Sequence, residues 1–168
     1  MRKWYACASL LVLGGSALAA SDLLLVFRGG IGVDPVSAVD PVTGAALPNV
    51  VRGVSPPGQP WTIRRLEATI RTDGRVEVKG RGLLLAGGNG IGTSAGQSVH
   101  ATLFCGPAAS ATAHSTPAAG VPLASDGDFR IEDSLNPAPP SPCTSPVLLI
   151  ENAGGRWFAA GLLANGDD

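Results

Sequence analysis

The chain has 168 residues, a formal net charge of −1, 23 glycines and 14 prolines. Setting the first 20 residues aside leaves 10 basic and 13 acidic residues, and hence a net charge of −3. This balance argues against a nucleic-acid partner, because a nucleic-acid-binding domain normally carries a basic surface.

The first 20 residues have the organisation of a secretory signal. Two basic residues near the start precede an apolar run over residues 8–18, and Ala17-Leu18-Ala19 is a small-residue cleavage site. Asp22 and Arg28 interrupt the apolar character that follows, whereas a membrane span needs about 20 apolar residues. We therefore expect no stable membrane insertion and a secreted or periplasmic location.

The cysteines predict a disulfide. Cys7 lies in the secretory signal, and processing leaves only Cys105 and Cys143. An even pair in an exported protein is typical of a disulfide. This bridge would close a loop of about 39 residues and stabilise the fold by at most about 4 kcal/mol. A remainder of about 150 residues can bury its own core, so residues 21–168 are expected to form one domain.

The stretch from Trp61 to Ala86 predicts two long antiparallel strands joined at Thr72-Asp73-Gly74. Apolar and polar residues alternate on both sides of the turn, which indicates one buried and one exposed face. Only a three-residue loop with a left-handed Gly74 keeps these faces consistent. Six basic residues of this stretch alternate with three acids, as on a solvated strand face. The expected cross-strand pairs are Ile70–Val76, Ala68–Val78, Glu67–Lys79 and Thr69–Glu77.

The rest of the chain contains turn signals at short intervals and no sustained helical period. We expect an antiparallel β-sandwich of about eight short strands, with a closed β-barrel as the alternative. Further strands are expected at 23–28, 33–39, 50–54, 83–86 and 98–105, and bends or loops at 29–32, 41–49, 55–60, 87–96, 107–120 and 136–146.

Two further hairpins are expected. Ser125-Asp126-Gly127 repeats the turn chemistry of the first hairpin and would join strands at 121–123 and 129–131. The last hairpin would join 147–151 to 156–162 and place Glu151 opposite Arg156.

Gly92-Thr93-Ser94-Ala95-Gly96 matches the G-x-S-x-G pattern that places a nucleophilic serine on a strand-to-helix turn. The sequence that follows is strand-like, and both histidines, His100 and His114, precede the acid Asp126, although triads recur in other orders. Ser94, His100 and His114 are therefore weak catalytic candidates, and we do not expect an enzyme.

Metal and cofactor sites are not expected either. His100, His114 and Cys105 lack the axial methionine of a typical blue-copper site, and Cys105 has a disulfide partner. Asp126 and Asp128 flank a turn glycine but supply few of the oxygens that calcium needs.

Trp61, Trp157 and Phe158 are the candidate binding residues. Trp157 and Phe158 are adjacent on a strand, so we expect one ring inside and the other partly exposed. The leading hypothesis is a non-catalytic exported module whose loops bind a protein or a glycan at the cell surface. The alternatives are a structural envelope protein without a discrete ligand and a small serine hydrolase using Ser94. The oligomeric state is left open.

Overall fold

The structure is a computed structural model that describes residues 22–164. The predicted secretory signal lies outside the described residues. Residues 22–164 form strands and turns and no helix, so no helix in this range could cross a membrane. The protein is all-β and antiparallel, as the sequence predicts.

The described chain contains thirteen strands, nine of which form one sheet. Their bounds, in chain order, are β1 Leu23–Gly32, β2 Val36–Val39, β3 Ala46–Pro48, β4 Trp61–Thr62, β5 Arg65–Arg71, β6 Arg75–Arg81, β7 Leu84–Leu85, β8 Ser98–Cys105, β9 Thr112–Ser115, β10 Val121–Pro122, β11 Phe129–Ser134, β12 Val147–Asn152 and β13 Trp157–Leu163.

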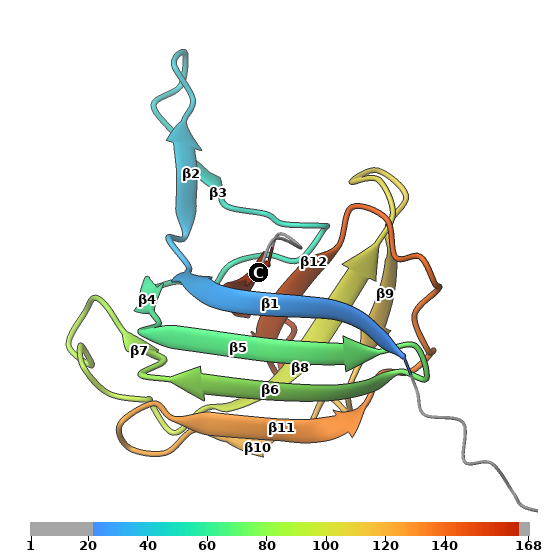
Figure 1. Cartoon of the computed structure of the whole chain (residues 1–168). Coiled ribbons are helices and arrows are strands. Elements are labelled where there is room, and N and C mark those ends of the chain that lie inside the picture. The colour runs from blue at the N-terminus through green and yellow to red at the C-terminus, as the bar shows by residue number, and fades with distance from the viewer. Residues whose placement is uncertain (1–21, 165–168) are drawn as a thin grey trace, which may run out of the picture.

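The main sheet is curled into a nearly closed barrel. Its strand order is β10-β8-β12-β13-β1-β5-β6-β11, and β9 also pairs with β8. Figure 1 shows β1, β5, β6 and β11 in front, with β8, β9 and β12 crossing behind them. The two halves also face one another as the layers of a sandwich do, so both descriptions fit the same sheet. Fully buried residues from both halves form one core, among them Leu66, Ile70, Val78, Leu103, Leu148 and Ile150.

The β5–β6 hairpin has the predicted register. Its pairs include Ile70–Val76, Ala68–Val78, Glu67–Lys79 and Thr69–Glu77. Gly74 has a φ of 87°, and its N–H donates to the Arg71 carbonyl at 2.9 Å. The three-residue loop is therefore confirmed.

The turn at Ser125-Asp126-Gly127 also forms, but it does not join a hairpin. β10 pairs with β8, whereas β11 pairs with β6, at the opposite end of the sheet order. The turn thus links the two edges of the sheet on one side of the barrel. Beyond the other end of β11, Ser115 and Asn136 form a single antiparallel bridge. The prediction of a hairpin over 121–131 was wrong because a turn sets local direction and not the partner of the strand that follows.

Glycines extend β1 through a segment that was expected to bend. A Cβ on Gly30 would lie 2.8 Å from the Cβ of Leu66, and one on Gly32 only 2.1 Å from the Trp61 carbonyl oxygen. These glycines let other chain segments pack against the strand, and they pair with β13 themselves. Residues 29–32 are therefore part of a strand, and the expected bend is reduced to a shift in the β1–β13 pairing between Phe27 and Gly30.

Three other local predictions also differ from the fold. The expected loop 41–49 contains β3, which pairs with β2 in a separate two-stranded hairpin. The expected strand 50–54 is a tight turn closed by a Val51–Val54 bridge. The expected irregular segment 107–120 contains β9, which pairs with β8. Each difference concerns short segments whose pairing partner decides their conformation.

The last hairpin forms with a shifted register. Glu151 lies opposite Trp157 and not opposite Arg156, because the pairing shifts after Ile150. Trp157 and Phe158 are both buried, so the expectation that one of the two rings is exposed was wrong. A bulge of this kind lets neighbouring residues of a strand depart from strict alternation.

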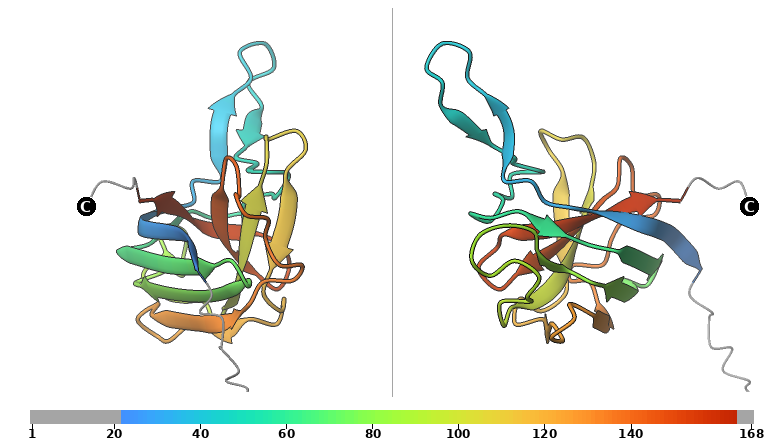
Figure 2. Two further views of the ribbon diagram at one scale, coloured as in Figure 1. Left: turned by 45° about the vertical axis from the view of Figure 1, so that its right-hand side comes forward. Right: turned by 90° about the vertical axis from the view of Figure 1, so that its left-hand side faces the viewer.

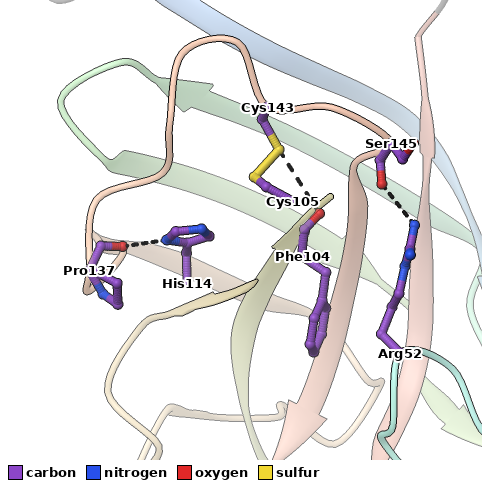
Figure 3. Close-up of a disulfide and its surroundings, with 7 residues drawn as sticks. All are labelled: Arg52, Phe104, Cys105, His114, Pro137, Cys143 and Ser145. Atoms are coloured by element: carbon purple, nitrogen blue, oxygen red, sulfur yellow. Dashed lines mark hydrogen bonds between the residues drawn. A yellow bond between two sulfur atoms is a disulfide. The ribbon is translucent and has the colours of Figure 1, made fainter. Parts of the chain in front are cut away.

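Cys105 and Cys143 form the predicted disulfide (Figure 3). It ties the end of β8 to the proline-rich loop 136–146. Two hydrogen bonds hold the same loop: Pro137 O accepts from His114 Nδ1 at 2.9 Å, and Ser145 O accepts from Arg52 Nη2 at 2.8 Å. A disulfide indicates a non-reducing compartment.

Candidate functional site

An open groove of about 760 Å³ lies beside the short β4–β7 pair. We call it the mouth groove. One wall comes from the base of the β2–β3 hairpin, through Pro35 and Pro48, and from the loop 55–59. The other residues that line it are Trp61, Leu85, Ala95, Gln97, Asn152, Arg156 and Phe158.

Backbone hydrogen bonds join the segments that form this groove. Val33 donates to the Phe158 carbonyl at 3.0 Å, and Trp61 donates to the Val33 carbonyl at 2.9 Å. The Trp157 indole Nε1 donates to the Asn49 carbonyl at 2.9 Å, which ties β13 to the segment after β3. Hydrogen bonds of the chain itself therefore tie the groove segments to β13 and to the segments that follow β1 and β3.

The aromatic residues of the groove are packed against each other. The rings of Trp61 and Phe158 stack with centroids 4.1 Å apart and an interplanar angle of 10°. They are only 5% and 2% exposed. These two of the three predicted binding residues thus lie in the groove but form its support, while Trp157 is buried beside it. Prolines and Leu85 supply much of the remaining apolar lining.

One end of the groove is polar. Asn152 Oδ1 accepts the backbone N–H groups of Gly154 and Arg156, at 3.0 and 3.1 Å. Asn152 Nδ2 donates to Gln97 Oε1 at 3.0 Å. This leaves the Gln97 amide N–H groups and the exposed Arg156 guanidinium without a partner among residues 22–164. The Gln97 amide, which is held through its oxygen, and the Arg156 guanidinium can both donate to carbonyl or carboxylate oxygens.

The aromatic residues of this site were predicted from the sequence, whereas its prolines and amides were not. Ser55-Pro-Pro-Gly-Gln-Pro60 is recognisable as a loop, and its composition was the available signal. Gln97, Asn152 and Arg156 carry no local pattern that indicates a site. Only the fold brings these residues together.

The catalytic candidates do not form a constellation. Ser94 is buried, and its backbone carbonyl accepts the Gln97 N–H at 3.1 Å. His114 Nδ1 is bonded to the Pro137 carbonyl, and His100 faces Glu151. Within the described part of the chain, no hydrogen bond joins Ser94 to either histidine. The same residues contain no cluster of three or more His, Cys, Asp or Glu side chains placed to hold a metal ion.

The acidic residues of the β5–β6 hairpin are paired with basic ones. Glu77 forms ion pairs with Lys79, at 2.8 Å, and with Arg130 of the neighbouring strand β11, at 2.9 Å. Arg75 pairs with Asp73 at 3.0 Å. These exposed pairs fit the expected solvated face better than a surface for an anionic ligand.

A second polar feature is the buried pair of His100 and Glu151, which face each other across β8 and β12. His100 Nε2 lies 4.0 Å from Glu151 Oε2, and His100 Nδ1 and Glu151 Oε1 are buried without a hydrogen-bond partner. Burial lowers the pKa of His100, opposed by a hydrogen bond to the Glu151 backbone. Burial raises the pKa of Glu151, opposed by a hydrogen bond from Thr102.

These shifts predict how Glu151→Gln changes stability with pH. A carboxyl with a raised folded-state pKa gives its full contribution to stability below its ordinary value of 4.5, and this contribution is lost as pH rises through the folded-state pKa. Glutamine resembles the protonated acid at every pH. Glu151→Gln should therefore raise the urea midpoint at pH 8 relative to wild type, and the gain should shrink toward pH 4. A rise in the urea midpoint that is the same at every pH would contradict a raised pKa of Glu151.

Comparison with known proteins finds no family model, curated protein or solved structure that matches this chain. The class of protein is therefore defined by its structure alone: an all-β, disulfide-bonded domain with an open groove beside its barrel.

Proposed function

We propose that this protein is a non-catalytic exported module whose mouth groove binds a short apolar segment of another polypeptide. The observation that carries the proposal is the groove itself, which is lined by prolines and Leu85 and is bordered at one end by the Gln97 amide and the Arg156 guanidinium. Binding sites for small ligands and peptide segments commonly combine an apolar lining with a few placed polar groups.

The groove supports a peptide better than a glycan. Sugar binding on aromatic residues needs an exposed ring, whereas Trp61 and Phe158 stack on each other and are almost fully buried. Prolines and Leu85 instead offer apolar surface to side chains. The Gln97 amide and the Arg156 guanidinium are suited to backbone carbonyls or an acidic side chain.

Gly58→Phe tests this proposal by filling the groove. Gly58 lines the groove, a Cβ there would have no neighbour within 4 Å, and its φ is outside the left-handed region. A peptide selected from a random library against the protein should bind Gly58→Phe at least about tenfold more weakly than wild type. Isothermal titration calorimetry measures the change.

Ile91→Phe is the matched control. Ile91 is 64% exposed and is not itself a lining residue of the groove, so this variant adds the same ring elsewhere. It should bind the peptide as wild type does. Equal affinity for wild type and Gly58→Phe would reject the groove as the binding site, and failure to select any peptide would favour a structural protein without a ligand.

A further inference from the structure

The β2–β3 hairpin projects away from the barrel in every view (Figures 1 and 2). We call residues 36–48 the arm. Every residue of its two strands is exposed, and the β2–β3 pair is a sheet of its own with two free edges. Its length corresponds to a reach of about 20 Å at the rise of a strand.

The exposed surface of the arm is apolar. Val39 is 61% exposed and Val42, at its tip, is 91% exposed, while Val36 and Leu47 are exposed on the strands. The strands carry no charged residue that would protect their edges. Isolated two-stranded hairpins are marginal in water, and open apolar edges invite pairing. These properties indicate that the arm contacts another surface.

The arm is nevertheless preformed. At its tip, Asp40 donates its backbone N–H to the Ala45 carbonyl at 2.9 Å, and Asp40 Oδ1 accepts the N–H groups of Val42 and Thr43, both at 2.8 Å. At its base, Asn49 donates to the Pro35 carbonyl at 2.9 Å. A preorganised arm loses little further entropy on binding.

Charge and position together identify the partner surface. Asp34 and Asp40 are the only charged residues of the arm and its base (residues 34–49). Among residues 22–164, Arg156 is the only charged residue that lines the mouth groove. The arm also leaves the barrel at the rim of this groove, because Pro35 and Pro48 line it. A two-fold axis beside this rim would let each arm reach the groove of the other copy, in the self-complementary contact of a symmetric dimer.

We infer that the protein dimerises by reciprocal exchange of arms, with the apolar, acidic tip of each arm bound in the mouth groove of a second copy. The inference rests on the proposed function, since it names the polypeptide segment that the groove binds. Val42 then enters the apolar part of the groove, and Asp40 lies toward Arg156.

Two variants and their mixture test this inference in sedimentation equilibrium. In the arm-free variant, Asn-Gly replaces residues 37–47, since Val36 and Pro48 are already paired across the hairpin. This deletion keeps Pro35 and Pro48 in the groove wall. Gly58→Phe keeps the arm and blocks the groove. Wild type should be dimeric, and each variant alone should have a dimer dissociation constant at least about 100-fold larger than that of wild type. Mixing the variants should restore association, because one supplies a groove and the other an arm.

Charge provides a second readout. Asp40→Asn retains an acceptor oxygen for the turn at the tip but removes the charge, and it should weaken the dimer, as should Arg156→Glu. The matched control Ile91→Lys alters an exposed apolar residue outside both surfaces and should leave the dimer unchanged.

The outcomes separate the two proposals. A monomeric wild type, an arm-free variant that still dimerises, or a mixture that fails to associate would overturn arm exchange. If the arm-free variant still binds the library-selected peptide in such a case, the groove remains a peptide site with a different partner. If wild type dimerises through the arm but the arm-free variant binds no selected peptide, recognition of other polypeptides fails and arm exchange stands.

Discussion

Replacing Cys105 and Cys143 together by alanine is expected to lower the free energy of unfolding by about 4 kcal/mol. The two cysteines are 38 residues apart, and their bridge restricts the unfolded chain by closing this loop. In the folded state the bridge anchors a loop that otherwise has few regular contacts, among them the bond from Gly106 N to the Thr144 carbonyl at 2.6 Å. Urea unfolding followed by tryptophan fluorescence measures the loss.

Reduction of the wild-type protein is the control for this prediction. Dithiothreitol should shift the urea midpoint of wild type to nearly that of the double variant and should not shift the variant. The barrel core lies mostly outside the bridged loop, so the variant should remain folded in water. If neither the double substitution nor reduction of wild type changed the urea midpoint, the bridge would add no stability.

Gly127→Ala is expected to destabilise the fold by about 3 kcal/mol. Gly127 has a φ of 81°, which costs an alanine about 1 kcal/mol. An added Cβ would also lie 2.5 Å from the carbonyl oxygen and 2.6 Å from the nitrogen of Leu83. These are backbone atoms that cannot rotate away, and overpacking of this kind costs about 2 kcal/mol more. The clash would push the turn that links β10 to β11 away from the barrel.

Gly53→Ala provides a matched control because it isolates the clash from the backbone strain. Gly53 has a φ of 82°, but a Cβ there would have no neighbour within 4 Å. The free energy of unfolding of Gly53→Ala should fall by only about 1 kcal/mol, which is the cost of a left-handed backbone for alanine. Equal losses for the two variants, measured by urea unfolding, would show that the turn does not need its close contact with Leu83.

Alternation and turn chemistry were sufficient to predict the β5–β6 hairpin. Its two strands are adjacent in sequence, and a shift of one residue would have put Ile70 opposite Glu77. Burial of one face therefore allowed only one register, and the structure confirms it. The disulfide was predictable for a similar reason, since only two cysteines remain after the predicted processing.

The same reasoning failed where the partner of a strand is distant in sequence. Ser125-Asp126-Gly127 has the turn chemistry of the first hairpin, yet its flanking strands pair with β8 and β6. The buried pair of His100 and Glu151 likewise depends on β8 lying next to β12. No local pattern specifies such neighbours, because they depend on how the whole sheet curls and closes.

Local periodicity, turn geometry and the number of cysteines were enough to predict the all-β class, the first hairpin with its register, and the disulfide. Contacts between distant segments, in contrast, determine how the main sheet curls, the burial of Trp157 and Phe158, the mouth groove and the projecting arm. One surface is formed by Pro35, Pro48, the loop 55–59 and the turn after β12. These segments come together only when β1 and β13 pair. The arm is exposed because β2 and β3 pair only with each other, in a sheet separate from the main one.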